Sequence, residues 1–101
     1  MSAPNVGTGT SASVVGILQS ATSTSGNHLI SLNTIHTLKN TNASSAVWVT
    51  GINATGPTST TTITYSNNLI HSLGFSSTTA QINGINITGG TALYANNMIR
   101  L

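Results

Sequence analysis

The chain has 101 residues, of which only 2% are charged, and it contains two cationic residues and no aspartate or glutamate. This length predicts a single domain, residues 1–101, with a modest core. Two cations displace few counterions from a phosphate backbone, so we expect no nucleic-acid binding. The absence of cysteine excludes disulfides and thiolate metal sites.

Serine, threonine and asparagine dominate the polar residues, and such a composition favours strands and turns over long helices. No run approaches the ~18 apolar residues of a membrane span, so we expect no membrane insertion. The N-terminal segment MSAPNVGTGTSAS has neither the basic start nor the apolar stretch of a signal peptide.

The first recurring element is VVGILQS at 14–20, which returns as VTGINATG at 49–56 and INGINITG at 82–89. The glycines at 16, 51 and 84 are therefore spaced by 35 and 33 residues. Each copy predicts a short strand that ends at a glycine bend, followed by a turn rich in threonine and glycine.

The second recurring element is LNTIHTL at 32–38, SNNLIHSL at 66–73 and ANNMIRL at 95–101. Its central asparagines, Asn33, Asn68 and Asn97, are spaced by 35 and 29 residues. We expect a longer strand up to each asparagine, a corner at the asparagine and a short strand beyond it. Asparagine suits a corner because it tolerates the left-handed conformation and its side chain bonds to backbone groups and to its own copies.

Two unrelated markers that share one period indicate a repeat architecture. We predict an all-β fold, a parallel β-solenoid of about three coils with a ~29–35-residue repeat, in which like residues stack at about 4.8 Å. The repeats cover approximately 11–45, 46–79 and 80–101, and the last is incomplete and complementary to the N-terminus. The structural columns expected are Asn33, Asn68 and Asn97; Ile35, Ile70 and Ile99; Gly16, Gly51 and Gly84; and Ile17, Ile52 and Ile85.

These motifs resemble the parallel right-handed β-helix repeats of large secreted bacterial surface proteins, whose coils often read x-G-I-x-x-x-G followed by N-x-I-x-x-L. The resemblance covers nearly the whole chain from about Ser11 and implies an extracellular or cell-surface location. It implies little about activity, because related β-helices include adhesins, fibre segments and polysaccharide-degrading enzymes. The enzymatic members carry acidic clusters, which this chain lacks.

His36, His71 and Arg100 share one repeat position and are expected to form a column. Two imidazoles could share a metal ion, but the arginine repels a cation and no carboxylate completes the site, so a polar surface column is the better interpretation. We expect His28 to lie in a turn of the first coil. Without an acid to orient a histidine, nucleophilic catalysis is not supported, and we expect no enzyme activity, no cofactor and no metal site.

Three Asn-x-Ser/Thr sequons, at Asn42, Asn53 and Asn86, are candidate glycosylation sites, although this composition makes chance or corner chemistry the favoured explanation. The threonine pairs Thr55 with Thr88 and Thr58 with Thr91 resemble the arrays of ice-binding proteins, but the intervening proline and glycines indicate a turn.

Joining the C-terminus to the N-terminus restores most of the missing part of the last repeat. The chain is therefore either an excerpt of a longer solenoid or a unit that stacks head to tail on itself, a contact that does not close and so generates filaments. We expect a structural, fibre-forming solenoid whose partner is a second copy. The alternative is an adhesin or a module that binds ice or carbohydrate through a face rich in threonine and asparagine.

Overall fold

The structure is a computed structural model that describes residues 5–20, 27–43, 46–56 and 62–101. These residues form strands and no helix, so the predicted all-β class is confirmed. The strands, in chain order, are β1 (Gly9–Ser20), β2 (His28–Ser31), β3 (Thr34–His36), β4 (Lys39–Asn40), β5 (Val47–Thr55), β6 (Ile63–Ser66), β7 (Leu69–His71), β8 (Gly74–Phe75), β9 (Ala80–Gly89), β10 (Ala92–Ala95) and β11 (Met98–Arg100).

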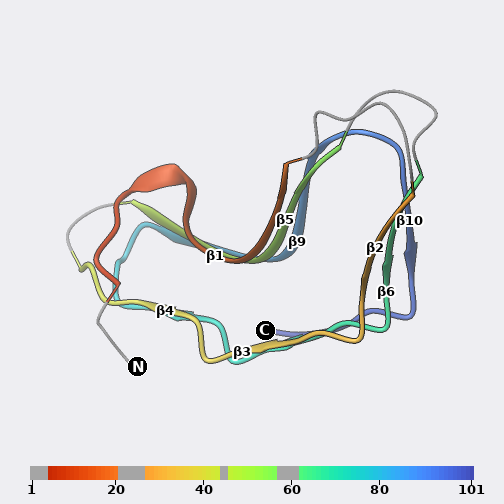
Figure 1. Ribbon diagram of the computed structural model, residues 1–101. Helices are drawn as coiled ribbons and strands as arrows, with labels where there is room; N and C mark the ends of the chain where they lie inside the picture. Colours follow the sequence, from red (N-terminus) through yellow and green to blue (C-terminus); the bar gives the residue numbers. More distant parts are fainter. Residues whose placement is uncertain (1–4, 21–26, 44–45, 57–61) are drawn as a thin grey trace.

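The strands form parallel sheets whose neighbours come from successive passes of the chain. Three sheets have the strand orders β1-β5-β9, β2-β6-β10 and β3-β7-β11, and a fourth sheet pairs β4 with β8. We call the passes layer 1 (β1 to β4), layer 2 (β5 to β8) and layer 3 (β9 to β11). Figure 1 shows the three layers lying almost over one another, so each sheet extends along the direction in which the layers stack. The predicted parallel pairing is confirmed.

The pairing register follows the spacing of the sequence repeats. Val14 pairs with Val49 and Val49 with Ile82, while Ile35 pairs with Ile70 and Ile70 with Ile99. Ile17, Ile52 and Ile85 are paired in the same way across the first sheet. Because like residues stand opposite one another in a parallel pair, each layer supplies the same kind of side chain to the same part of the interior.

The long strands pass through their glycines, which corrects the prediction that a short strand ends there. β5 runs across Gly51 from Val47 to Thr55, and both Val49 and Ile52 are fully buried, so the alternation of inward-facing residues shifts by one position at the glycine. The phase break in the sequence therefore marks an irregularity inside a continuous strand. The sheet that contains β1, β5 and β9 is visibly curved in Figure 1.

The glycine column brings two sheets into close contact. A Cβ atom on Gly51 would lie 2.6 Å from the carbonyl oxygen of Gly84 and 2.6 Å from Cγ2 of Ile70. The same approach joins Gly16 to Ile35 and Gly84 to Ile99. The sheet of β1, β5 and β9 can thus lie directly on the isoleucines of β3, β7 and β11.

The apolar core is most completely buried in layer 2. Ile70 is 0% exposed, whereas its neighbours Ile35 and Ile99 are 7% and 44% exposed. The buried cluster consists of Val14, Ile35, Val49, Ile52, Ala54, Ile63, Tyr65, Ile70 and Leu73. Layer 3 therefore presents apolar surface, at Ile99, that a further layer would cover.

The tight corner of each layer lies one residue before the asparagine column, which corrects the predicted position of the left-handed residue. Leu32, Asn67 and Asn96 have φ values of 58°, 53° and 53°. A second left-handed corner holds Thr37 and Ser72, with φ values of 59° and 55°. The column asparagines are thus free to use their side chains between layers.

We expect Leu32→Asn to stabilise the protein. Leu32 is 80% exposed and left-handed, while the equivalent residues of the other layers are asparagines. The left-handed conformation costs an ordinary L-residue roughly 1–2 kcal/mol, and asparagine tolerates it better, so a gain of about 1 kcal/mol is expected. Thermal unfolding should show a rise in Tm of about 4–8 °C, the shift typical of such a gain in a small domain.

Leu29→Asn is the matched control, because Leu29 is also exposed but lies within β2. Asparagine is disfavoured in strands, so this variant should not be stabilised. Equal changes in Tm for the two variants would contradict the conformational explanation.

Candidate functional site

One asparagine from each layer joins a continuous column of amide hydrogen bonds. The backbone N–H and Nδ2 of Asn33 donate to Oδ1 of Asn68 at 3.1 and 2.9 Å. The same two groups of Asn68 donate to Oδ1 of Asn97 at 3.1 and 2.9 Å. Asn68 is 1% exposed, and its Nδ2 also donates to the carbonyl oxygen of Ile30 at 3.0 Å. The column fixes the relative register of the three corners.

All amide-to-amide bonds of this column run from layer 1 toward layer 3. Oδ1 of Asn68 and of Asn97 each accepts two bonds, whereas Oδ1 of Asn33 accepts none from the described residues. At the other end, Nδ2 of Asn97 donates to the carbonyl oxygen of Tyr65 at 2.8 Å and so has one hydrogen left. The backbone N–H of Asn97 has no acceptor within the described part of the chain. Layer 1 thus presents an unmatched acceptor, and layer 3 presents unmatched donors.

The two ends of the stack also expose strand edges. The first-layer end carries the outer edges of β1, β2 and β3, and the third-layer end carries those of β9, β10 and β11. A depression of about 340 Å³ at the first-layer end is lined by Gly16, Ile17, Asn33, Thr34, Ile35, His36 and Leu38. A second, of about 280 Å³, is lined by His71, Ser72, Arg100 and Leu101. At the first-layer end, strand edges and core side chains such as Ile35 are therefore available together.

The fourth sheet is displaced by one layer, a feature that the sequence did not predict. Asn5 forms a parallel bridge with Asn40 of β4, and the N–H of Thr41 donates to the carbonyl oxygen of Asn5 at 2.8 Å. Nδ2 of Asn40 donates to the carbonyl oxygen of Gly7, also at 2.8 Å. Among the described residues, layer 3 adds no strand to this sheet. At the first-layer end, the segment at Asn5 therefore extends one level beyond layer 1. At the third-layer end, β8 lies one level short of layer 3.

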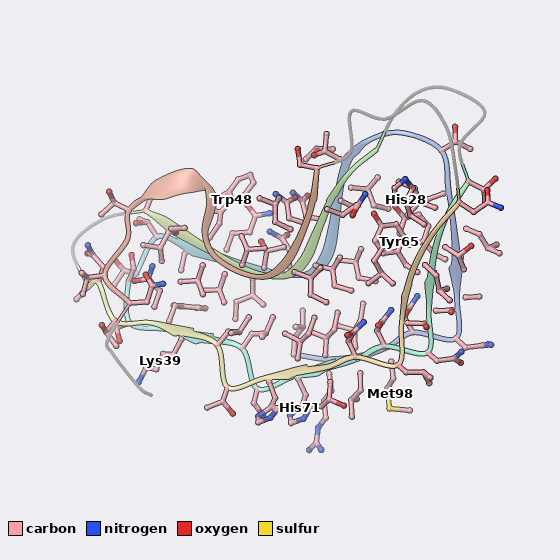
Figure 2. All side chains as sticks on the ribbon, in the orientation of Figure 1. His28, Lys39, Trp48, Tyr65, His71 and Met98 are labelled. Carbon is pink, nitrogen blue, oxygen red and sulfur yellow. The ribbon has the colours of Figure 1, made fainter. Side chains whose placement is uncertain are left out.

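His36, His71 and Arg100 lie in one column on adjacent strands. The two imidazole rings are stacked with centroids 5.3 Å apart, and Arg100 pairs in register with His71. Nδ1 of His36 lies 2.8 Å from the hydroxyl of Thr37, and Nδ1 of His71 lies 2.9 Å from that of Ser72. Figure 2 shows His71 pointing away from the core. This arrangement is a surface stack whose third member is a fixed cation.

His28 lies at the start of β2, which corrects its predicted place in a turn. Its Nε2 is buried and has no hydrogen-bond partner, as is also true of the hydroxyl of Tyr65. Figure 2 shows the two residues at the same side of the interior. Two polar atoms in this part of the core are therefore unsatisfied.

Tyr65 stacks on Tyr94 in the interior, with ring centroids 4.9 Å apart and an angle of 4° between the planes. Burial, together with repulsion from Tyr94, raises the pKa of Tyr65 to about 12. Burial also raises the pKa of Tyr94 above its ordinary value. The folded protein therefore holds both phenolic protons more tightly than the unfolded chain does.

We expect the free energy of unfolding to fall as the pH rises from about 10 to 12. Unfolded tyrosine titrates near pH 10, so the contribution of Tyr65 is fully present below that pH and is lost as the pH passes its folded pKa of about 12. Tyr65→Phe should reduce this loss and raise stability at pH 8 by about 1 kcal/mol, because it removes an unpaired buried hydroxyl. Urea unfolding at pH 8 and pH 11 measures both effects. Tyr94→Phe is the control, and a larger gain at pH 8 from that variant would contradict the explanation.

The candidate glycosylation residues all make side-chain hydrogen bonds. Nδ2 of Asn86 donates to Oδ1 of Asn53 at 2.9 Å, and Nδ2 of Asn42 donates to the carbonyl oxygen of Val6 at 3.2 Å. Nδ2 is the atom that a glycan would modify, so modification of Asn42 or Asn86 would break one of these bonds.

The threonine columns do not form a free hydroxyl array where the structure describes them. The hydroxyls of Thr55 and Thr88 hydrogen-bond to each other, and that of Thr88 also donates to the carbonyl oxygen of Ala54 at 3.2 Å. Thr58 lies outside the described residues, while Thr91 is exposed. Hydroxyls that satisfy each other are less available to ice or to a sugar.

Residues 5–20, 27–43, 46–56 and 62–101 bring no three histidine, cysteine or acidic side chains together as a metal site. The same residues contain no helix with the length and apolar character needed to cross a membrane. Comparisons with protein-family models, curated proteins and solved structures gave no match.

Proposed function

We propose that each layer is one coil of a parallel β-solenoid and that the chain is a structural unit of an extracellular fibre, built by head-to-tail stacking of copies. The observation that carries this proposal is the one-way amide column, with an unmatched acceptor at Asn33 and unmatched donors at Asn97. Each end offers the chemical complement of the other. A second copy is the partner that satisfies both.

The surface chemistry supports association between copies. The chain has no acidic residue and only two full cations, so long-range repulsion between copies is weak. Open strand edges pair readily with other strands, and proteins that remain monomeric usually block them with charge, proline or a covering element. No helix covers either end within the described residues.

The contact between copies is heterologous, because the first-layer end of one copy meets the third-layer end of another. Such a contact repeats without closing when the copies share one axis, and it generates filaments. The resemblance of the chain's sequence to the repeats of secreted bacterial surface proteins supports an extracellular location.

Electron microscopy and sedimentation of the purified chain test this function. We expect filaments with an axial repeat of about 14–15 Å, corresponding to three strand spacings, and a reflection near 4.8 Å in fibre diffraction. Monodisperse monomers at micromolar concentration would contradict the proposal.

The alternative function is binding of ice or carbohydrate through the face that carries Asn53, Thr55, Asn86 and Thr88. The in-register pairing of Asn53 with Asn86 across β5 and β9 favours it, but an irregularity places Gly89 opposite Thr55. The bonds of these side chains to one another also reduce the groups available to a ligand. Thermal hysteresis and binding to a glycan array would support this alternative. If neither thermal hysteresis nor glycan binding is detected, the fibre function stands as the better supported proposal.

A further inference from the structure

We propose that successive copies meet in one defined register, with β11 of one copy paired in parallel to β3 of the next in the register that joins β7 to β11. The inference rests on the head-to-tail stacking proposed above and adds the residues that meet. Asn97 then lies against Asn33 of the next copy, and Met98 lies against Thr34. The interface becomes one more repetition of the contacts inside the protein.

The amide column favours this register. In the stacked arrangement, the N–H and Nδ2 of Asn97 donate to Oδ1 of Asn33 in the next copy, as Asn68 donates to Asn97 within the chain. Within the chain, Nδ2 of Asn97 donates back to Tyr65, the register partner of Tyr94. Nδ2 of Asn33 donates to the carbonyl oxygen of Ser31 at 3.1 Å within one chain, and in the next copy it would exchange this bond for one to the carbonyl oxygen of Tyr94 by the same pattern. All the unmatched amide groups find partners in this register.

The backbone at the corner continues in the same way. The N–H groups of Leu69 and Met98 each donate to the carbonyl oxygen of the asparagine in the preceding layer, both at 2.8 Å. Thr34 of the next copy occupies the equivalent position, so its N–H donates to the carbonyl oxygen of Asn97. The corner therefore contributes backbone and side-chain bonds in one register.

The apolar surface selects against other registers. Ile99, which is 44% exposed, is covered by Ile35 of the next copy, just as Ile70 covers Ile35 within the chain. A slip of one residue would turn the isoleucine of β3 to the opposite face. A slip of two residues would place Ile35 opposite Asn97 and leave the amide groups unmatched. Burial and hydrogen bonding thus favour the same alignment.

The displaced fourth sheet completes the fit. Within the chain, Asn5 pairs with Asn40, which in turn pairs with Phe75 of β8. When layer 1 of the next copy lies on layer 3, its Asn5 is one level lower and so reaches the outer edge of β8. The segment around Asn5 of one copy thus lies beside β8 of the other, and this contact opposes rotation of the copies about their common axis.

The double variant T34C/M98C tests the register directly. Both side chains are exposed, and the wild-type chain has no cysteine, so the introduced thiols are the only ones present. Within one chain the two positions are two strand spacings apart, about 10 Å, which is too far for a disulfide. Between stacked copies they are directly opposed. Oxidation of the filaments should give a series of covalent multimers on a non-reducing gel, with more than half of the protein cross-linked.

A second pair tests another sheet with the same logic. Leu29 and Leu93 are 68% and 56% exposed and both pair with Thr64, from opposite sides. L29C/L93C should therefore give the same series of multimers. T34C/R100C is the matched control, because it moves one thiol two residues along β11 to the same face, about 8 Å from its partner, and should cross-link weakly.

The outcomes separate this register from the function on which it rests. Filaments that form but cross-link better through T34C/R100C than through T34C/M98C would overturn the register and leave the fibre function standing. Efficient dimers from T34C alone would show that like ends meet and would overturn the polarity. A wild-type chain that forms no filaments would overturn both proposals.

Discussion

Replacing Gly51 with alanine is expected to lower the free energy of unfolding by about 3 kcal/mol, at the upper end of the range for an overpacked core. The new Cβ would lie 2.6 Å both from the carbonyl oxygen of Gly84, on the adjacent strand β9, and from Cγ2 of Ile70, in the facing sheet, so neither neighbour can remain in place. The backbone oxygen has no rotamer to adopt, and the adjacent layers must separate. Chemical denaturation of the variant measures the effect.

Gly74→Ala is the matched control for this substitution. A Cβ at Gly74 would meet only Cγ of Lys39, at 3.8 Å, which is an ordinary contact. We expect this variant to remain within about 0.5 kcal/mol of the wild type. Equal losses at the two positions would mean that backbone entropy, rather than the close approach, determines the effect.

A double-mutant cycle can identify the contact responsible. Ile70→Ala alone should cost about 2–5 kcal/mol, because it leaves a cavity in the most buried layer. Combined with Gly51→Ala, the total loss should be smaller than the sum, since the new methyl group enters space that the isoleucine leaves. Strict additivity would argue against the packing of Gly51 on Ile70.

Asn68→Ala is the second substitution with a large expected effect, a loss of about 3 kcal/mol. It removes the central amide of the column and leaves groups of Asn33, Asn97 and Ile30 without their partners. Several of these groups are covered by protein and cannot recover hydrogen bonds to water. The folded state is therefore destabilised relative to the unfolded state. Urea unfolding should show a lower midpoint with an unchanged slope.

Asn86→Ala provides the comparison, because its side chain makes a single amide bond, to Asn53. We expect a loss of about 0.5–1 kcal/mol, the usual contribution of one hydrogen bond. A similar loss in both variants would show that the column bonds at Asn68 have no special importance.

The parallel pairing and the grouping of Asn33, Asn68 and Asn97 could be predicted from the sequence, because equal spacing in successive repeats places like residues opposite one another. The identity of the left-handed residue could not. Leu32 occupies that corner in layer 1, although leucine is a poor residue for it, so propensity alone points to the neighbouring asparagine. The pairing of the layers over-determines the corner and overrides the local preference.

The continuous strand through the glycine column could not be predicted from the sequence, for a different reason. A glycine at a phase break is equally consistent with a bend that ends a strand and with an irregularity inside one. Only the approach of Ile70 to Gly51 identifies a continuous strand packed against a second sheet. The fourth sheet was missed because two-residue strands such as Lys39–Asn40 carry no alternation to detect. The direction of the amide bonds was likewise invisible, since identical residues can donate either way.

That common direction gives the asparagine column an electric polarity. Asn33 and Asn68 each point one Nδ2–H toward layer 3, and Asn68 and Asn97 each point the accepting oxygen toward layer 1, so the dipoles of these successive amide-to-amide bonds add. Aligned hydrogen bonds polarise one another, and each becomes somewhat stronger as the series lengthens. In a longer stack, a layer would therefore be held more firmly in the middle than at a tip. Short stacks would lose their terminal layers more readily than long ones.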